Sequence, residues 1–210
     1  MRILSVSTGL AAPLFVPAPG GKREQVMSGI RKSPVSTLAD PQRIAVDELG
    51  FAFDEQVDLT VHGGRDKAVY AYPIEHYATW RTIREQATKI DTPLPHGFMG
   101  ENLTIEGLLE TRVWVGDVLL LEPVEASDAP PVRLRVNAPR QPCFKFNAVM
   151  GFNHASKMML QSGFTGFYLE VLQTGTVTAG ATIRVLPGAR EVTIEELHRL
   201  MTRGKQKNLF

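Results

Sequence analysis

The chain has 210 residues, of which 43% are hydrophobic and 21% are charged, with 23 Lys and Arg against 22 Asp and Glu. This length fits one large domain, and a chain of this size buries about 70% of its unfolded surface, so its core needs no disulfide or structural metal. The net charge of +1 excludes a strong global field and argues against nucleic acid as a partner. The single cysteine excludes an internal disulfide and an iron–sulfur cluster built from this chain's own thiolates.

The N-terminal segment MRILSVSTGLAAPLFVPAPG is only mildly apolar, because Ser, Thr and Pro residues interrupt it. It therefore lacks the continuous apolar region of a signal peptide. No segment of the sequence approaches the about 20 apolar residues of a membrane-spanning helix. We expect a cytoplasmic protein with no membrane partner.

Short strands separated by Gly and Pro dominate the first half of the chain. Alternating apolar and polar residues predict strands at 2–8 and, more weakly, at 43–49. The segment 16–36 between them is rich in Pro, Gly and basic residues and is predicted to be a long loop. A strand at 67–73 then leads through Pro73 into a helix at 74–90, where apolar residues recur at helical spacing.

The second half of the chain follows the same pattern. Strands are predicted at 101–107, 112–116, 117–124, 132–138, 165–175 and 181–187. A short helix is predicted at 153–163, with Asn153 as its N-cap, and a C-terminal helix at 193–203, where Thr193 and Glu196 are spaced as a capping box. Many short strands without regular strand–helix alternation favour a mainly β fold, a β-barrel with a few helical insertions and a C-terminal helix. We expect the barrel domain to span 1–187 and the C-terminal helix and tail to span 188–210.

The common catalytic motifs are absent from the sequence. It contains no P-loop, no dinucleotide-binding G-x-G-x-x-G and no G-x-S-x-G, and its 5 histidines never recur at the spacing of zinc ligands. Zinc hydrolysis and Ser-His-Asp chemistry therefore have no support.

The stretch VHGGRDKAVYAYP (61–73) combines glycines with hydrogen-bond donors. Gly63 and Gly64 allow positive φ, so successive N–H groups can converge on an anion, with His62, Arg65 and Lys67 around them. The alternative is a Gly-Gly hairpin turn with solvated charges. Further along, Asn102 precedes a predicted strand, where its amide either recognises the edge of a heterocycle or serves as a turn residue.

The only cysteine, Cys143, lies in APRQPCFKFN (138–147). Lone cysteines most often behave as small buried apolar residues. Against this, Pro139 and Pro142 predict a rigid loop, and Arg140 and Lys145 would stabilise a thiolate. A thiolate binds soft metals and is also a nucleophile. Because no second cysteine and no evident His partner accompany it, metal ligation is favoured over nucleophilic attack, with a structural role as the alternative.

Six segments in a fixed order resemble the MOSC domain family, which is related to the C-terminal domain of molybdenum cofactor sulfurase. More closely, the chain is similar to bacterial MOSC proteins that confer resistance to 6-N-hydroxylaminopurine. The segments cover most of residues 1–187 and are MSGIRKSPV (27–35), VHGGRDKAVYAYPIEHY (61–77), GENLTIEGLLE (100–110), VWVGDVLLLE (114–122), RQPCFKFN (140–147) and TGFYLEVLQTGTVTAG (165–180).

The resemblance implies a β-barrel that binds the molybdenum cofactor (Mo-molybdopterin), with Cys143 as the Mo ligand and catalytic residue. The implied activity is that of an oxidoreductase in detoxification, which reduces N-hydroxylated bases such as 6-N-hydroxylaminopurine to the amine and takes electrons from a separate reductase. One alternative is a non-catalytic module that carries the cofactor or sulfur, and another is a barrel that has lost its cofactor. The expected cofactor-binding residues are Lys32, His62, Gly63, Gly64, Arg65, Asp66, Lys67, Asn102, Arg140 and Lys145.

Three positions depart from the family pattern, and one of them is Ala181, which stands where the family commonly has the Asp of Ala-Gly-Asp. Phe53, in GFAFD, stands where the family usually has the second Gly of Gly-Leu-x-Gly-Asp. Phe164, in GFTG, stands where the family usually has Arg. The missing Arg would remove a contact to a phosphate or a substrate, so these departures bear on which substrate the protein takes.

Overall fold

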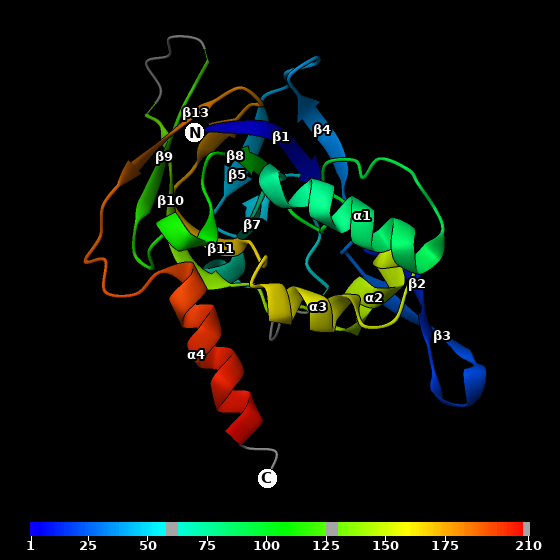
Figure 1. Cartoon of the computed structure of the whole chain (residues 1–210). Coiled ribbons are helices and arrows are strands. Elements are labelled where there is room, and N and C mark those ends of the chain that lie inside the picture. Colours follow the sequence, from blue (N-terminus) through cyan, green and yellow to red (C-terminus); the bar gives the residue numbers. More distant parts are fainter. Residues whose placement is uncertain (58–62, 125–129, 208–210) are drawn as a thin grey trace.

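The computed structural model describes residues 1–57, 63–124 and 130–207, and within these ranges seven strands close into a β-barrel (Figure 1). Neighbouring strands are antiparallel except for β7 and β8, which are parallel. The fold class predicted from the sequence is confirmed. In their order around the ring, the strands are β1 (Arg2–Thr8), β13 (Thr182–Leu186), β9 (Val118–Glu122), β10 (Val132–Pro139), β11 (Phe167–Gln173), β7 (Val69–Pro73) and β8 (Leu103–Glu106), which pairs again with β1.

The barrel forms because its strands alternate between apolar and polar residues. In β10, Val132, Leu134 and Val136 are buried, whereas Arg133 and Arg135 face the solvent. The side chains that point inward from the strands pack into one apolar core, and replacing a single buried Leu by Ala in such a core costs about 2–5 kcal/mol. The core includes Ile3, Leu103, Ile105, Leu119 and Leu169.

Three smaller strand pairings lie outside the ring, and two of them correct the expected loop at 16–36. β2 (Ala12–Pro17) and β3 (Arg23–Ser28) form a hairpin that projects from the barrel (Figure 1), and β4 (Ser33–Thr37) pairs with β1. Gly20 and Gly21 make the hairpin turn at positive φ. The hairpin was not predicted from the sequence, because most of β3 is solvent-exposed and polar and its alternation of apolar and polar residues is weak. The third pairing joins β12 (Gly175–Val177), β5 (Ile44–Asp47) and β6 (Gly50–Phe51).

The helices α1 (Tyr77–Thr88), α2 (Phe144–Met150) and α3 (Ala155–Ser162) share a second apolar cluster around Trp80, Phe146 and Met159, beside the barrel core. The final helix, α4 (Ile194–Lys207), extends away from the barrel (Figure 1). The helix predicted at 74–90 is confirmed, as is the capping box of α4, where the Thr193 hydroxyl accepts from Glu196 N and the Glu196 carboxylate accepts from Thr193 N. None of the helices in the described ranges is long and apolar enough to cross a membrane.

Two further expectations about local structure are wrong. The strand predicted at 112–116 is replaced by a 3₁₀ helix, η4 (Glu110–Arg112), after which Trp114 forms only an isolated bridge to Thr193. The N-cap of α3 is His154 instead of Asn153, because the chain enters the helix through His154 in the left-handed conformation.

Candidate cofactor pocket

A pocket opens where β1 and β10 end and β7, β8 and β11 begin. These strand ends lie together because the strand register places Val6, Leu103, Ala71, Phe167 and Pro139 in one row across β1, β8, β7, β11 and β10. The pocket brings together residues that are far apart in the sequence. Six of the expected site residues line it: Lys32, Lys67, Asn102, Arg140, Cys143 and Lys145.

Cys143 lies at the start of α2, immediately after Pro142. It is the N-cap residue of this helix, and its carbonyl accepts a hydrogen bond from Phe146 N at 3.0 Å. The sequence predicted a rigid loop here, and the structure places the cysteine at the junction between the end of β10 and a helix that the sequence analysis did not anticipate. The side chain is half-buried and lines the pocket, so the thiol is accessible from the cavity.

Arg140 forms part of the pocket wall beside Cys143. It is only 6% exposed, and its guanidinium lies 4.9 Å from the ring centre of Tyr70 and 5.2 Å from that of Phe146. Its Nη1 donates to the Met99 carbonyl and, at 3.3 Å, to the Tyr70 hydroxyl. A fixed cation of this kind favours the thiolate form of a neighbouring cysteine.

Two tyrosines complete this wall. Burial raises the pKa of both Tyr70 and Tyr168, so each remains a neutral phenol. Neither tyrosine was predicted as a site residue, because each lies in an ordinary β-strand sequence. Only the pairing of β7 with β11 places them side by side. Their ring centres are 5.2 Å apart.

On the opposite side of the pocket, Lys32 forms a buried ion pair with Asp54, and their side chains are 8% and 4% exposed. Asp54 also accepts hydrogen bonds from Gly9 N and from Asn102 Nδ2, each at 2.9 Å. Burial lowers the pKa of Lys32, and the carboxylate of Asp54 partly opposes this effect. Asp54 was not among the expected site residues, although it is the Asp of the GFAFD stretch.

Asn102 uses its amide to join separate segments of the wall. Its Oδ1 accepts from Tyr70 N at 3.0 Å, and its Nδ2 donates to the Ser7 carbonyl at 3.3 Å as well as to Asp54. The amide thus connects β1, β7 and the Asp54 segment. This structural role is neither of the two that the sequence suggested for Asn102.

The Gly-Gly stretch is only partly placed at the pocket. Gly64 has a φ of 86° and leads into a 3₁₀ helix, η2 (Arg65–Lys67), so the hairpin-turn interpretation is wrong. Lys67 lines the pocket, whereas Gly63, Gly64, Arg65 and Asp66 are not among its lining residues. Arg65 instead pairs with Glu48 at the surface, and the Asp66 carbonyl accepts from Asn137. His62 lies outside the described residues, and its role stays a prediction.

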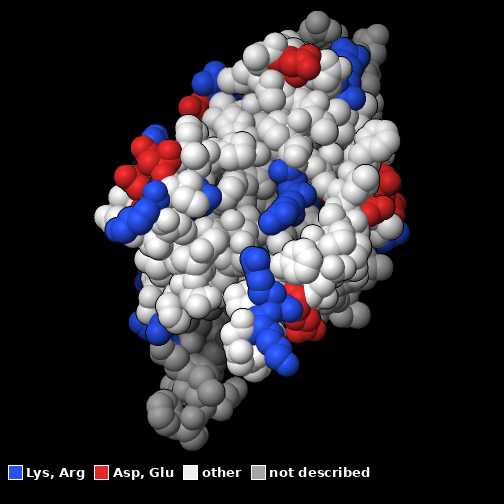
Figure 2. Space-filling model, turned by 90° about the vertical axis from the view of Figure 1, so that its right-hand side faces the viewer, with Lys and Arg blue, Asp and Glu red and all other residues white. Residues whose placement is uncertain are grey.

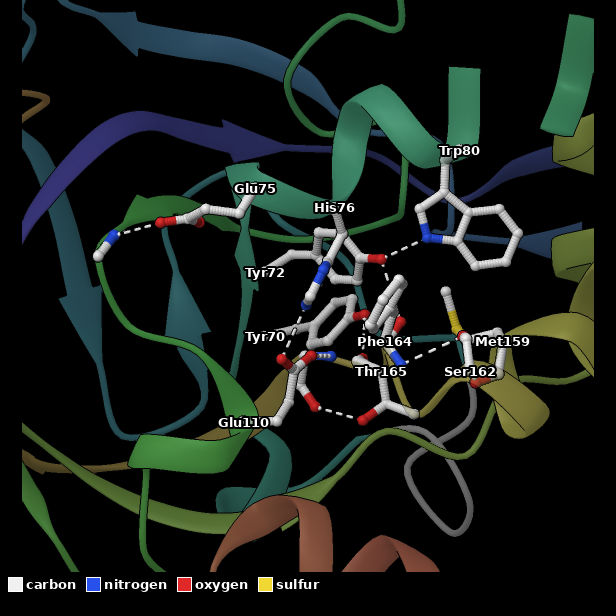
Figure 3. Close-up of polar contacts among 12 residues, drawn as sticks. Tyr70, Tyr72, Glu75, His76, Trp80, Glu110, Met159, Ser162, Phe164 and Thr165 are labelled. Atoms are coloured by element: carbon white, nitrogen blue, oxygen red, sulfur yellow. Dashed lines mark hydrogen bonds and ion pairs between the residues drawn. The ribbon is translucent and has the colours of Figure 1, made fainter. Parts of the chain in front are cut away.

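Phe164 lies in a polar cluster behind the pocket wall (Figure 3). Its ring stacks on His76 at 4.0 Å, and His76 in turn pairs with the buried Glu110 at 2.8 Å. The Phe164 carbonyl accepts a hydrogen bond from the Tyr72 hydroxyl at 3.0 Å, and the neighbouring Thr165 carbonyl accepts one from the Tyr70 hydroxyl at 2.6 Å. The position where the family usually has Arg is therefore occupied by an aromatic side chain, and the tyrosines tie this loop to the pocket wall.

The residues of the pocket fit a metal held by an anionic organic cofactor. In the parts of the chain that the structure describes, no group of three or more His, Cys, Asp or Glu could hold a metal ion by itself. Cys143 offers one thiolate, the soft ligand that molybdenum would take if a dithiolene supplied the others. Lys32, Lys67, Arg140 and Lys145 provide cations for an anionic group.

The fold and the match to a family model define the class of the protein. Residues 58–184, more than half of the chain, match the MOSC domain model, and the chain belongs to this family. Within the family, it is similar to YflK of Bacillus subtilis, with 34% identity over 200 residues, 95% of this chain and 80% of YflK. It is also 32% identical over 167 residues to YiiM of Escherichia coli, which covers 79% of this chain and 69% of YiiM.

Solved structures agree with this assignment. The crystal structure of YiiM from Geobacillus stearothermophilus has a TM-score of 0.69 and 27% identity, over 97% of this chain and 85% of that one. A protein of Gibberella moniliformis named "Reductase" is 34% identical over 125 residues, which are 60% of this chain but only 20% of that protein. The resemblance to a YiiM-type MOSC protein, inferred from the six sequence segments, is confirmed.

Proposed function

We propose that this protein is a molybdenum-cofactor-dependent reductase of N-hydroxylated bases, such as 6-N-hydroxylaminopurine. The main support for the proposal is that one pocket contains both an accessible thiol, that of Cys143, and several basic side chains. These are Lys32, Lys67, Arg140 and Lys145. Membership in the MOSC family and the similarity to a protein named Reductase add support for a redox role.

The net reaction is R–NH–OH + 2 H⁺ + 2 e⁻ → R–NH₂ + H₂O, in which the N–O bond breaks and the oxygen leaves as water. The bound cofactor supplies the oxygen-removing redox chemistry, and the protein supplies ligation, orientation and a shaped cavity. Cys143 would ligate the metal, and Lys67 and Lys145 would hold anionic groups of the cofactor. Tyr70 and Tyr168 line the same pocket as Cys143, and as neutral phenols they add no negative charge to it.

Electrons must reach the pocket from another protein. The chain's single cysteine cannot build an iron–sulfur cluster, and the sequence has no dinucleotide-binding motif. A separate reductase that delivers two electrons per turnover is therefore part of the proposal.

The test is metal analysis combined with turnover. Protein purified from a host that makes the cofactor is expected to hold about one Mo per chain, because the pocket offers one thiolate ligand. Cys143→Ser is expected to lose the metal, whereas Ser162→Ala, at the exposed end of α3, is expected to keep it. Turnover of 6-N-hydroxylaminopurine is measured with dithionite-reduced methyl viologen as the donor. Absence of Mo from the unmodified protein would refute the proposal, and bound Mo without turnover would favour the carrier role instead.

A further inference from the structure

Phe53 combines two unfavourable features at the edge of the pocket. Its φ is 65°, in the left-handed region that favours glycine, and its side chain is 79% exposed. Bulky residues rarely adopt this conformation, and exposing a phenyl ring to water gains nothing for folding. The segment that follows it, from Asp54 to Val57, lines the pocket. A strained and exposed aromatic residue in this place indicates a role at the surface.

Other apolar side chains are exposed along the same rim. Val57 lines the pocket and is 42% exposed, and Phe144, which lies between the pocket residues Cys143 and Lys145, is 53% exposed. Met27 is 47% exposed and directly precedes the lining residue Ser28, and its carbonyl accepts from Lys145 Nζ at 3.1 Å. We call Met27, Phe53, Val57 and Phe144 the apolar rim. These residues come from three separate segments, and each either lines the pocket or directly neighbours a lining residue in the chain.

Basic side chains lie near the apolar rim in the sequence and at the pocket. Arg31 is exposed between the pocket residues Ile30 and Lys32, and Lys67 and Lys145 lie at the pocket itself. The neighbouring acid, Glu55, accepts a hydrogen bond from Ala11 N at 2.7 Å. Figure 2 shows one face of the molecule, with Lys and Arg side chains near its middle and both basic and acidic side chains around its edges.

We propose that the apolar rim and Arg31 form the docking surface for the electron-donating protein, which presents an acidic surface around its redox cofactor. This inference rests on the proposed function. Interfaces of this kind are typically anchored by a few central aromatic residues, and complementary charge steers the two proteins together. Docking at this rim places the donor's cofactor at the opening that leads to Cys143. The donor loses one electron in each of two encounters, and the substrate gains both.

The experiment compares a small electron donor with a protein donor. Methyl viologen, reduced by dithionite, diffuses into the pocket and needs no docking surface. Flavodoxin, a small acidic flavoprotein kept in its hydroquinone form, serves as the protein donor and gives up one electron per encounter as it becomes the semiquinone. Turnover of 6-N-hydroxylaminopurine is measured with each donor for the unmodified protein and for Phe53→Gly and Arg31→Glu.

Each variant is expected to lose kcat/KM for flavodoxin by about tenfold, as is typical of an anchoring aromatic or a steering charge. Turnover with methyl viologen is expected to stay within about twofold, because neither residue lines the pocket. The Tm of Phe53→Gly is expected to match or exceed that of the unmodified protein, since Gly relieves the strain at positive φ. The loss in Arg31→Glu is expected to shrink at high salt.

Leu172→Ser is the matched control. Leu172 is 44% exposed, and it lies at the end of β11 remote from the pocket, because Gln173 pairs with Arg133 whereas Phe167 pairs with Pro139. It should leave both rates unchanged.

Four results would overturn the docking surface: unchanged flavodoxin kinetics in both variants, equal losses with both donors, an equal loss in Leu172→Ser, or no flavodoxin turnover by a protein that is active with methyl viologen. Vesicles of anionic phospholipid and sedimentation test the rival occupants. Phe53-dependent vesicle binding or self-association with unchanged donor kinetics would assign the rim to a membrane or to a second copy. Absence of turnover with either donor would instead refute the proposed function.

Discussion

Removing the carboxylate of Asp54 should destabilise the protein strongly, because this group neutralises Lys32 inside the pocket wall. The change Asp54→Ala leaves the Lys32 ammonium buried without its counter-ion, since their side chains are 8% and 4% exposed. It also deprives Gly9 N and Asn102 Nδ2 of an acceptor to which each donates at 2.9 Å. Breaking a buried ion pair by removing one partner costs about 3–5 kcal/mol.

In a domain of this size, each kcal/mol shifts the Tm by about 2–4 °C, so the expected fall is about 6–20 °C. The assay is thermal and urea unfolding of protein made without the cofactor, so that ligand binding does not contribute. Lys32→Met is expected to be similarly costly, and the double variant should be less destabilised than the sum of the two single changes.

The control is Glu170→Ala, which removes the Arg135–Glu170 ion pair on the barrel surface, where the side chains are 46% and 21% exposed. Pairs this accessible contribute at most about 1 kcal/mol. If Asp54→Ala lost no more stability than Glu170→Ala, the interpretation of a neutralised, buried Lys32 would be wrong.

Three further predictions concern stability. Thr193→Ala removes the capping box of α4 and should cost about 1 kcal/mol in urea unfolding, whereas Thr193→Ser should retain it; equal losses would contradict the cap. Gly166→Ala should cost about 2–4 kcal/mol, because the added Cβ would lie 2.4 Å from the Ala71 carbonyl at a φ of +60°, and a Tm within error of the unmodified protein would exclude this clash. The pKa of Lys32 in the folded protein lies below its ordinary value of 10.5, so between these two pKa values the unfolded chain keeps a proton that the folded protein has lost. The free energy of unfolding should therefore rise with pH over this range. Lys32→Met should lose this rise, and an unchanged pH profile in this variant would refute the assignment to Lys32.

The barrel was predictable because its signals are local. Clean alternation along β10 and the run of short strands between Gly and Pro define strands without knowledge of their partners. The β2–β3 hairpin was missed because its exposed strand, β3, lacks a buried face along most of its length. α2 was missed because Pro139 and Pro142 dominate a segment whose helix spans only 7 residues.

The candidate site was only partly predictable for a different reason. Lys32, Lys67 and Cys143 carry charge or sulfur in unusual local sequences, so single residues stand out. Asp54 and Tyr168 contribute through contacts with residues more than twenty positions away, which depend on strand register. Arg65 was expected at the site, but its guanidinium pairs with Glu48 at the surface, and its part in binding a cofactor stays a prediction.

The closure of the barrel has a consequence for its synthesis. β1 completes the ring by pairing with β13, through Arg2 and Thr182. Until β13 is available, β9 has an open edge, the kind of surface that promotes aggregation, whereas β4 covers most of the corresponding edge of β1. Closure of the ring therefore waits for β13, the last of its strands along the chain. Nascent chains stalled before residue 182 should bind chaperones that full-length chains have already released.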